Sequence, residues 1–127
     1  MDQCTCTCSP AEILLFPCSG GSNVGQIANA AAVRLNVEQV GKMYCLAGIG
    51  GHIESMLTSA KGASRIVAID GCPVACARQT LQHAGFAVTD HVVVTELGIE
   101  KRYELEPPPE AVAKVVGRVK ESLGVAS

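Results

Sequence analysis

The chain has 127 residues, the length of one domain, and such a chain can bury a core without disulfide bonds. Its composition is 48% hydrophobic but only 3% aromatic, so the core has to consist of Ala, Val, Ile and Leu, as suits an α/β protein. The formal net charge is −2 and the ten basic residues form no cluster, which excludes the charge pattern of a nucleic-acid or membrane-surface binder.

The N-terminal sequence MDQCTCTC has no basic start and no apolar stretch before Ile13, so it does not resemble a signal peptide. No apolar run approaches the roughly 20 residues that span a bilayer. We therefore expect a cytoplasmic protein, in which thiols stay reduced. The seven cysteines then indicate metal or thiol chemistry rather than a disulfide framework.

Residues 1–10 are predicted to form a flexible, Cys-rich tail, and residues 11–127 a single α/β domain. After the tail, short apolar runs alternate along the chain with stretches of helical periodicity. The predicted strands are 12–17, 40–46, 65–69 and 91–97, and the predicted helices are 24–35, 52–60, 73–84 and 110–123. Strand starts recur about every 25 residues, as in βαβ units.

This alternation predicts a three-layer, doubly wound α/β fold, in which a mainly parallel four-stranded sheet carries helices on both faces. By analogy with flavodoxin-like and Rossmann-like domains, we expect the strand order 2-1-3-4. The carboxyl ends of parallel strands share one edge of the sheet, where open α/β sheets bind their ligands.

Four cysteines follow the predicted strand ends. Cys18 comes just after the first strand, Cys45 near the end of the second, and Cys72 just after the third, with Cys76 one helical turn later. Since neighbouring strands lie about 5 Å apart, the four sulfurs can converge on one point. Four thiolates form a tetrahedral Zn²⁺ site, which we predict here. The alternative is that each is a small buried apolar residue, a reading favoured most for Cys45.

The segment DGCPVAC, residues 70–76, predicts a helix start with Cys72 as N-cap, Pro73 as the first helical residue and Cys76 one turn in. Both thiols would then lie near the positive end of a helix dipole, which favours the thiolate. Their spacing of four places them on one helix face, suited to chelation. This spacing does not match the C-x-x-C of thioredoxin-like redox sites.

Asp70 and His52 are candidates for roles beside the thiols. Asp70 ends a buried strand, and we expect it to cap the following loop or helix. The alternative is that Asp70 does not bind the metal itself but orients a residue that does. His52 follows AGIGG and is expected to be a helix-start residue; the alternative is a fifth ligand or proton carrier. His83 and His91 are predicted at the surface, away from this edge.

The glycine-rich loops lack the motifs of nucleotide sites. Gly20-x4-Gly25 is not followed by the Lys and Ser/Thr of a phosphate-binding loop, and AGIGG continues to Ile53 where a dinucleotide fingerprint needs glycine. We expect these glycines to bring backbone amides close to thiolates instead.

The tail thiols Cys4, Cys6 and Cys8 form C-x-C-x-C. The tail enters the first strand at the edge opposite to the predicted site, and a strand spans about 20 Å. We therefore expect these three thiols to lie outside the metal site.

Three segments resemble the signature of the DGC-domain proteins of bacteria and archaea. They are DGCPVACA at residues 70–77, FPCSGG at 16–21 and C-x-x-G-x-G-G at 45–51. The resemblance covers about residues 12–100. It implies zinc binding with Cys18, Cys45, Cys72 and Cys76 as ligands, the set also reached from the strand ends, and it implies no particular reaction.

We therefore predict a zinc-binding protein, either a carrier or accessory protein or one with a structural metal, since four thiolates leave no open position for catalysis. The alternative is a thiol-redox enzyme or sensor that uses Cys72 and Cys76. An iron–sulfur electron carrier is less favoured, because no ferredoxin-type spacing is present. The residues leave open whether the protein is an enzyme, and they indicate no protein partner.

Overall fold

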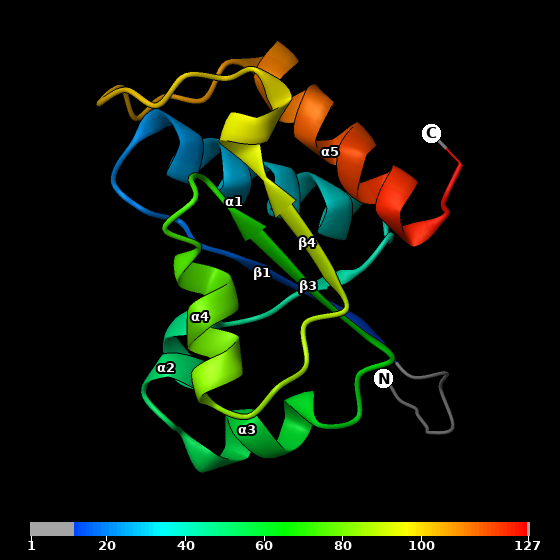
Figure 1. Ribbon diagram of the computed structural model, residues 1–127. Helices are drawn as coiled ribbons and strands as arrows, with labels where there is room; N and C mark the ends of the chain where they lie inside the picture. The colour runs from blue at the N-terminus through cyan, green and yellow to red at the C-terminus, as the bar shows by residue number, and fades with distance from the viewer. Residues whose placement is uncertain (1–11, 127) are drawn as a thin grey trace.

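The computed structural model describes residues 12–126, so the predicted tail and its three cysteines lie outside the described residues (Figure 1). The elements in chain order are β1 (Ile13–Pro17), α1 (Asn23–Val37), β2 (Lys42–Met43), α2 (Leu46–Gly50), α3 (Glu54–Ala60), β3 (Arg65–Asp70), α4 (Cys76–His83), β4 (Asp90–Val93), the 3-10 helix η1 (Val94–Leu97) and α5 (Pro109–Leu123). Strands and helices alternate as the sequence predicts.

The four strands form one parallel sheet in the order β2-β1-β3-β4. β1 pairs with β3 along its whole length, from Ile13 opposite Arg65 to Pro17 opposite Ile69. β2 adds two residues at one edge, and β4 pairs with the second half of β3 at the other. The predicted α/β class and the strand order 2-1-3-4 are thereby confirmed.

Helices cover both faces of this sheet. α1 and α5 pack together on one face, and α2, α3 and α4 lie on the other (Figure 1). Successive strand residues point to opposite faces, so Leu15 and Val67 enter the core under α1 and α5, while Leu14 and Ala68 enter the core under α4. Both cores are mainly aliphatic, as the composition requires. Among the described residues, no helix is both long and apolar enough to cross a bilayer.

Two strands end earlier than the sequence predicts. β2 has only two residues, because the chain turns at Cys45 into α2, which takes up most of the AGIGG segment that the sequence predicts to be a turn. Cys45 is therefore the N-cap residue of α2 and follows the strand instead of lying inside it. β4 ends at Val93, and the last four residues of the predicted strand, 94–97, form η1.

The start of α4 also differs from the prediction. Residues 72–75 form a tight turn, closed by a hydrogen bond from the Ala75 N–H to the Cys72 carbonyl at 3.0 Å, and Ala75 has the left-handed φ of 56°. The helix begins only at Cys76. Cys72 is thus a loop residue and Cys76 the first residue of the helix, so the predicted N-cap role of Cys72 is wrong.

Glycines allow three backbone segments to meet beside these cysteines. A Cβ atom on Gly71 would lie 2.8 Å from the amide nitrogen of Gly25 and from the carbonyl carbon of Val24. A Cβ atom on Gly25 would lie 2.4 Å from the Gly20 carbonyl oxygen. The end of β3, the start of α1 and the loop after β1 are therefore in direct backbone contact.

We expect Gly71→Ala to lower the free energy of unfolding by about 1–3 kcal/mol, because the added methyl group overlaps backbone atoms that cannot rotate away. Gly62→Ala is the matched control, since a Cβ there meets no atom within 4 Å. Denaturant unfolding of both variants measures the effect. Equal stability of the two variants would contradict the close contact.

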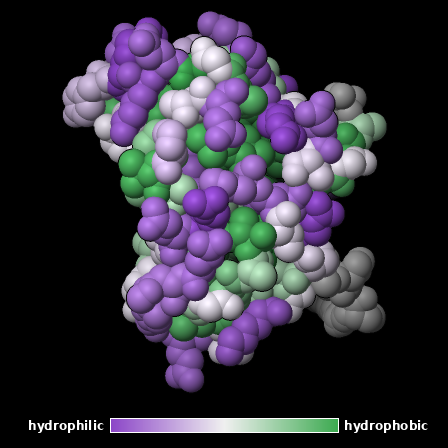
Figure 2. Space-filling view, viewed as in Figure 1, coloured by the Kyte–Doolittle hydropathy of each residue, from purple (hydrophilic) through white to green (hydrophobic). Residues whose placement is uncertain are grey.

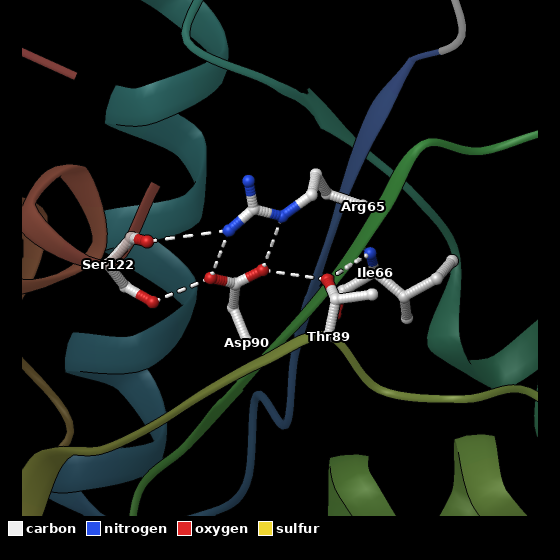
Figure 3. A network of polar contacts seen from close by, with 5 residues as sticks. All are labelled: Arg65, Ile66, Thr89, Asp90 and Ser122. Atoms are coloured by element: carbon white, nitrogen blue, oxygen red, sulfur yellow. Dashed lines mark hydrogen bonds and ion pairs between the residues drawn. The ribbon is translucent and has the colours of Figure 1, made fainter. Parts of the chain in front are cut away.

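A polar network joins β3, β4 and α5 at the amino edge of the sheet (Figure 3). The Asp90 carboxylate, 3% exposed, accepts hydrogen bonds from Arg65 Nε at 2.9 Å and Nη2 at 2.7 Å. It also accepts from Thr89 Oγ1 at 2.7 Å and Ser122 Oγ at 2.6 Å. Burial opposes ionisation of Asp90, but these hydrogen bonds and the Arg65 charge outweigh it and hold the pKa of Asp90 below its ordinary value.

A carboxyl group with a lowered pKa in the folded state stabilises the fold above its unfolded-state pKa, and the contribution is lost as pH falls through the folded-state pKa. Asp90→Asn should therefore cost about 1–2 kcal/mol at neutral pH, allowing for partial screening by solvent. The difference from the unmodified chain should shrink in acid. Unfolding curves across this pH range test the expectation, and a difference independent of pH would refute it.

Candidate functional site

Cys18 lies where the loop after β1 meets the end of β3. Its N–H donates to the Ile69 carbonyl at 3.0 Å, and the Gly71 N–H donates to its Sγ at 3.3 Å. Burial raises the pKa of the Cys18 thiol; the backbone N–H groups of Gly20 and Gly71 act in the opposite direction, because they stabilise a negative sulfur.

Three of the four predicted thiols line one cavity of about 220 Å³, which we call the thiol pocket. Cys18 enters it from the loop after β1, Cys72 from the turn after β3, and Cys76 from the first residue of α4. Residues 20–22, Asp70, Val74 and Lys101 are among the other residues of its lining. The carboxyl edge of the sheet thus gathers thiols from chain segments distant in sequence.

Cys45 shares a different pocket with Cys18. These two residues line a second, neighbouring pocket together with Met43, Tyr44 and Asn29. Cys18 is therefore common to both pockets, while Cys45 is absent from the lining of the thiol pocket. All four cysteines are free thiols, and Cys45 and Cys76 are exposed.

The donor set of this edge suits a soft cation, because thiolates are the ligands that Zn²⁺ takes in closed tetrahedral sites. Within residues 12–126, however, no three His, Cys, Asp or Glu side chains are already grouped closely enough to hold an ion. Metal binding would therefore require the thiol side chains or their loops to move together.

Asp70 fixes the start of α4 from the end of β3. Its carboxylate, 1% exposed, accepts hydrogen bonds from the N–H groups of Ala77 at 2.7 Å and Arg78 at 3.2 Å. The capping interpretation of Asp70 is confirmed by these bonds. They hold the helical turn that carries Cys76, whereas action of Asp70 on a metal ligand stays a prediction.

The positions of His91 and His52 can be compared with their predicted positions. His91 Nε2 lies 2.8 Å from Asp70 Oδ2 and its side chain is only 20% exposed, so its predicted surface position away from this edge is wrong. His52 lies outside the linings of both thiol-bearing pockets, and its ring contacts that of His83 at 5.6 Å between centroids. α3 begins at Glu54 with Ile53 as its N-cap, so the predicted helix-start position of His52 is wrong. A ligand or proton-carrier role of His52 stays a prediction.

Lys101 is the other residue that the sequence did not reveal. It comes from the loop between η1 and α5, and its Nζ lies 3.5 Å from Cys72 Sγ. No motif links the two residues, which are 29 positions apart. Only the folding of this loop over the carboxyl edge brings a positive charge to the thiol pocket.

The site can now be compared with known proteins. The family model of the DGC domain matches residues 14–119, which include all four thiols and Lys101. The chain belongs to the DGC-domain family. It is 39% identical over 90 residues to the protein named "Anaerobic and virulence modulator AnvM" of Pseudomonas aeruginosa, an alignment that covers 71% of this chain and 69% of that relative. No solved structure matches this DGC-domain chain.

In this DGC domain, we expect Asp70→Ala to lower the free energy of unfolding by about 2–4 kcal/mol, because it removes a buried carboxylate and leaves its donors without a partner. The amides of Ala77 and Arg78 should exchange with solvent faster, because they lose their acceptor. Glu96→Ala, at an exposed position, is the control. Hydrogen exchange followed by NMR measures both the free energy of unfolding and the exchange of the two amides. Unchanged protection of the Ala77 amide in Asp70→Ala would exclude the capping role.

Proposed function

We propose that this protein binds one Zn²⁺ ion through Cys18, Cys72 and Cys76, with Cys45 as the fourth ligand, and acts as a metal carrier or accessory protein or holds the ion as a structural metal. The observation that carries the proposal is the meeting of the first three thiols in one cavity. Cys18 is distant in sequence from the neighbouring pair Cys72 and Cys76, so a purely local reason, such as helix periodicity, does not explain why it meets them.

The surroundings of the sulfurs support the same function. The Gly71 N–H donates to Cys18 Sγ, and Lys101 Nζ approaches Cys72 Sγ, so two of the sulfurs have donors suited to negative charge. Thiolates are the form that binds zinc, and the reducing cytoplasm expected for this protein would keep them available. The name of its relative, a modulator, favours an accessory role over a reaction of its own.

The test is the metal content of the full chain, purified without oxygen, chelator or an affinity metal. We expect about one zinc per chain and no visible absorption, because Zn²⁺ is a d¹⁰ ion. A brown chromophore would instead identify an iron–sulfur carrier. A metal-free protein that readily forms a Cys72–Cys76 disulfide would replace the proposal with the thiol-redox alternative.

Cysteine variants then assign the ligands. Cys18→Ser should reduce bound zinc more than Cys45→Ser, because Cys18 lines both pockets while Cys45 lines only the second. The matched control replaces Cys4, Cys6 and Cys8 by Ser, and we expect it to keep one zinc per chain. Unchanged zinc content in Cys18→Ser, or loss of zinc in the control, would remove the thiol pocket from the proposal.

A further inference from the structure

Lys101 is the cation of the thiol pocket. Its Nζ lies 3.5 Å from Cys72 Sγ, and it lines the same cavity as Cys18 and Cys76. Residues 99–108 project as a loop at the upper left of Figure 1, and hydrophilic side chains dominate that part of the surface in Figure 2. The Lys101 side chain nevertheless reaches back from this loop to a sulfur.

A buried asparagine holds the backbone on both sides of Lys101. Asn23, 4% exposed, donates from Nδ2 to the Glu100 carbonyl at 2.7 Å and accepts from the Arg102 N–H at 2.5 Å. Its own N–H donates to the Arg102 carbonyl at 2.9 Å. Three hydrogen bonds thus clamp the residues before and after Lys101 to the first turn of α1, which fixes where the lysine side chain starts.

The charge of Lys101 is not used elsewhere in the described part of the chain. Among residues 12–126, Lys101 forms no ion pair, and Cys72 Sγ is its one polar side-chain contact. The neighbouring Arg102 differs, because it pairs with Glu104 at 2.8 Å. Asp70 also lines the pocket, but its carboxylate already accepts from backbone amides of α4 and contacts His91. Within the described residues, Lys101 therefore faces Cys72 with no ion-pair partner of its own, while the negative charge of Asp70 acts on Cys18.

We propose that Lys101 is the charge partner of the thiol pocket: its ammonium group offsets the negative charge that accumulates on the sulfurs and draws anionic reagents to Cys72. Four thiolates around one Zn²⁺ leave a net charge of about −2, and a nearby ammonium group lowers the electrostatic cost of that charge. The metal-related half of this role rests on the proposed function, whereas attraction of anions to Cys72 does not.

The first measurement is zinc affinity, by competition with a chromophoric chelator in the full chain. Lys101→Met should weaken zinc binding about tenfold. This is the loss of affinity typical when a residue that contacts a metal ligand is replaced. Lys101→Arg should retain most of the affinity. Lys114→Met is the matched control, because Lys114 is exposed and its Nζ donates to the Leu97 carbonyl, away from the thiols. The number of zinc ions per chain should be one in every variant.

The second measurement uses metal-free protein and compares alkylation of Cys72 by iodoacetate, an anion, with that by neutral iodoacetamide, followed by peptide mass spectrometry. Both reagents consume the same thiolate, so the ratio of their rates reports the local charge and not the degree of ionisation. Lys101→Met should lower this ratio several-fold at low salt, and added salt should reduce the difference. Lys114→Met should leave the ratio unchanged.

An unchanged alkylation ratio in Lys101→Met overturns the proposal, and so does unchanged zinc affinity in a protein that binds zinc. If the unmodified chain binds no zinc, the proposed function fails, and the alkylation ratio alone decides whether Lys101 is the charge partner of the thiols. A lower ratio in Lys101→Met, with Lys101→Arg close to the unmodified chain, supports it.

Discussion

The parallel pairing of β1 with β3 is the constraint on which the rest of this structure depends. Its register places Pro17 opposite Ile69, and one further hydrogen bond, from Cys18 to Ile69, carries the pairing past the end of β1. The residues that follow the two strands must then lie side by side. This is why Cys18 receives the Gly71 N–H, and why the turn that carries Cys72 borders the same pocket.

Buried polar side chains hold a helix and a loop in place around that edge. Asp70 holds the first turn of α4, and His91 on β4 supports the carboxylate from the other side. Asn23 at the start of α1 holds the loop that carries Lys101. Cys76 and Lys101 are thus each positioned by a buried polar residue of another element, whereas Cys18 is held by backbone hydrogen bonds with Ile69 and Gly71. The sheet edge and both helical layers therefore jointly define the site.

Much of this arrangement could be predicted from the sequence. Continuous apolar runs such as those at β1 and β3 are typical of strands buried on both faces, and their regular alternation with helices leaves few topologies. Cysteines at strand ends then fall at one edge. The start of α4 was missed because Pro73 is a common first helical residue, and nothing local shows that Ala75 adopts a left-handed conformation. His91 and Lys101 were missed because their partners are set by tertiary folding alone.

The shortness of β2 has a consequence beyond the placement of Cys45. An edge strand exposes unpaired backbone groups that can recruit a strand from another molecule, and long, flat edges promote aggregation. β2 offers only Lys42 and Met43 before the chain turns into α2, and Lys42 adds a charge. Because β2 ends early, just before Cys45, this edge exposes few unpaired backbone groups. A strand from another molecule therefore has little to pair with here.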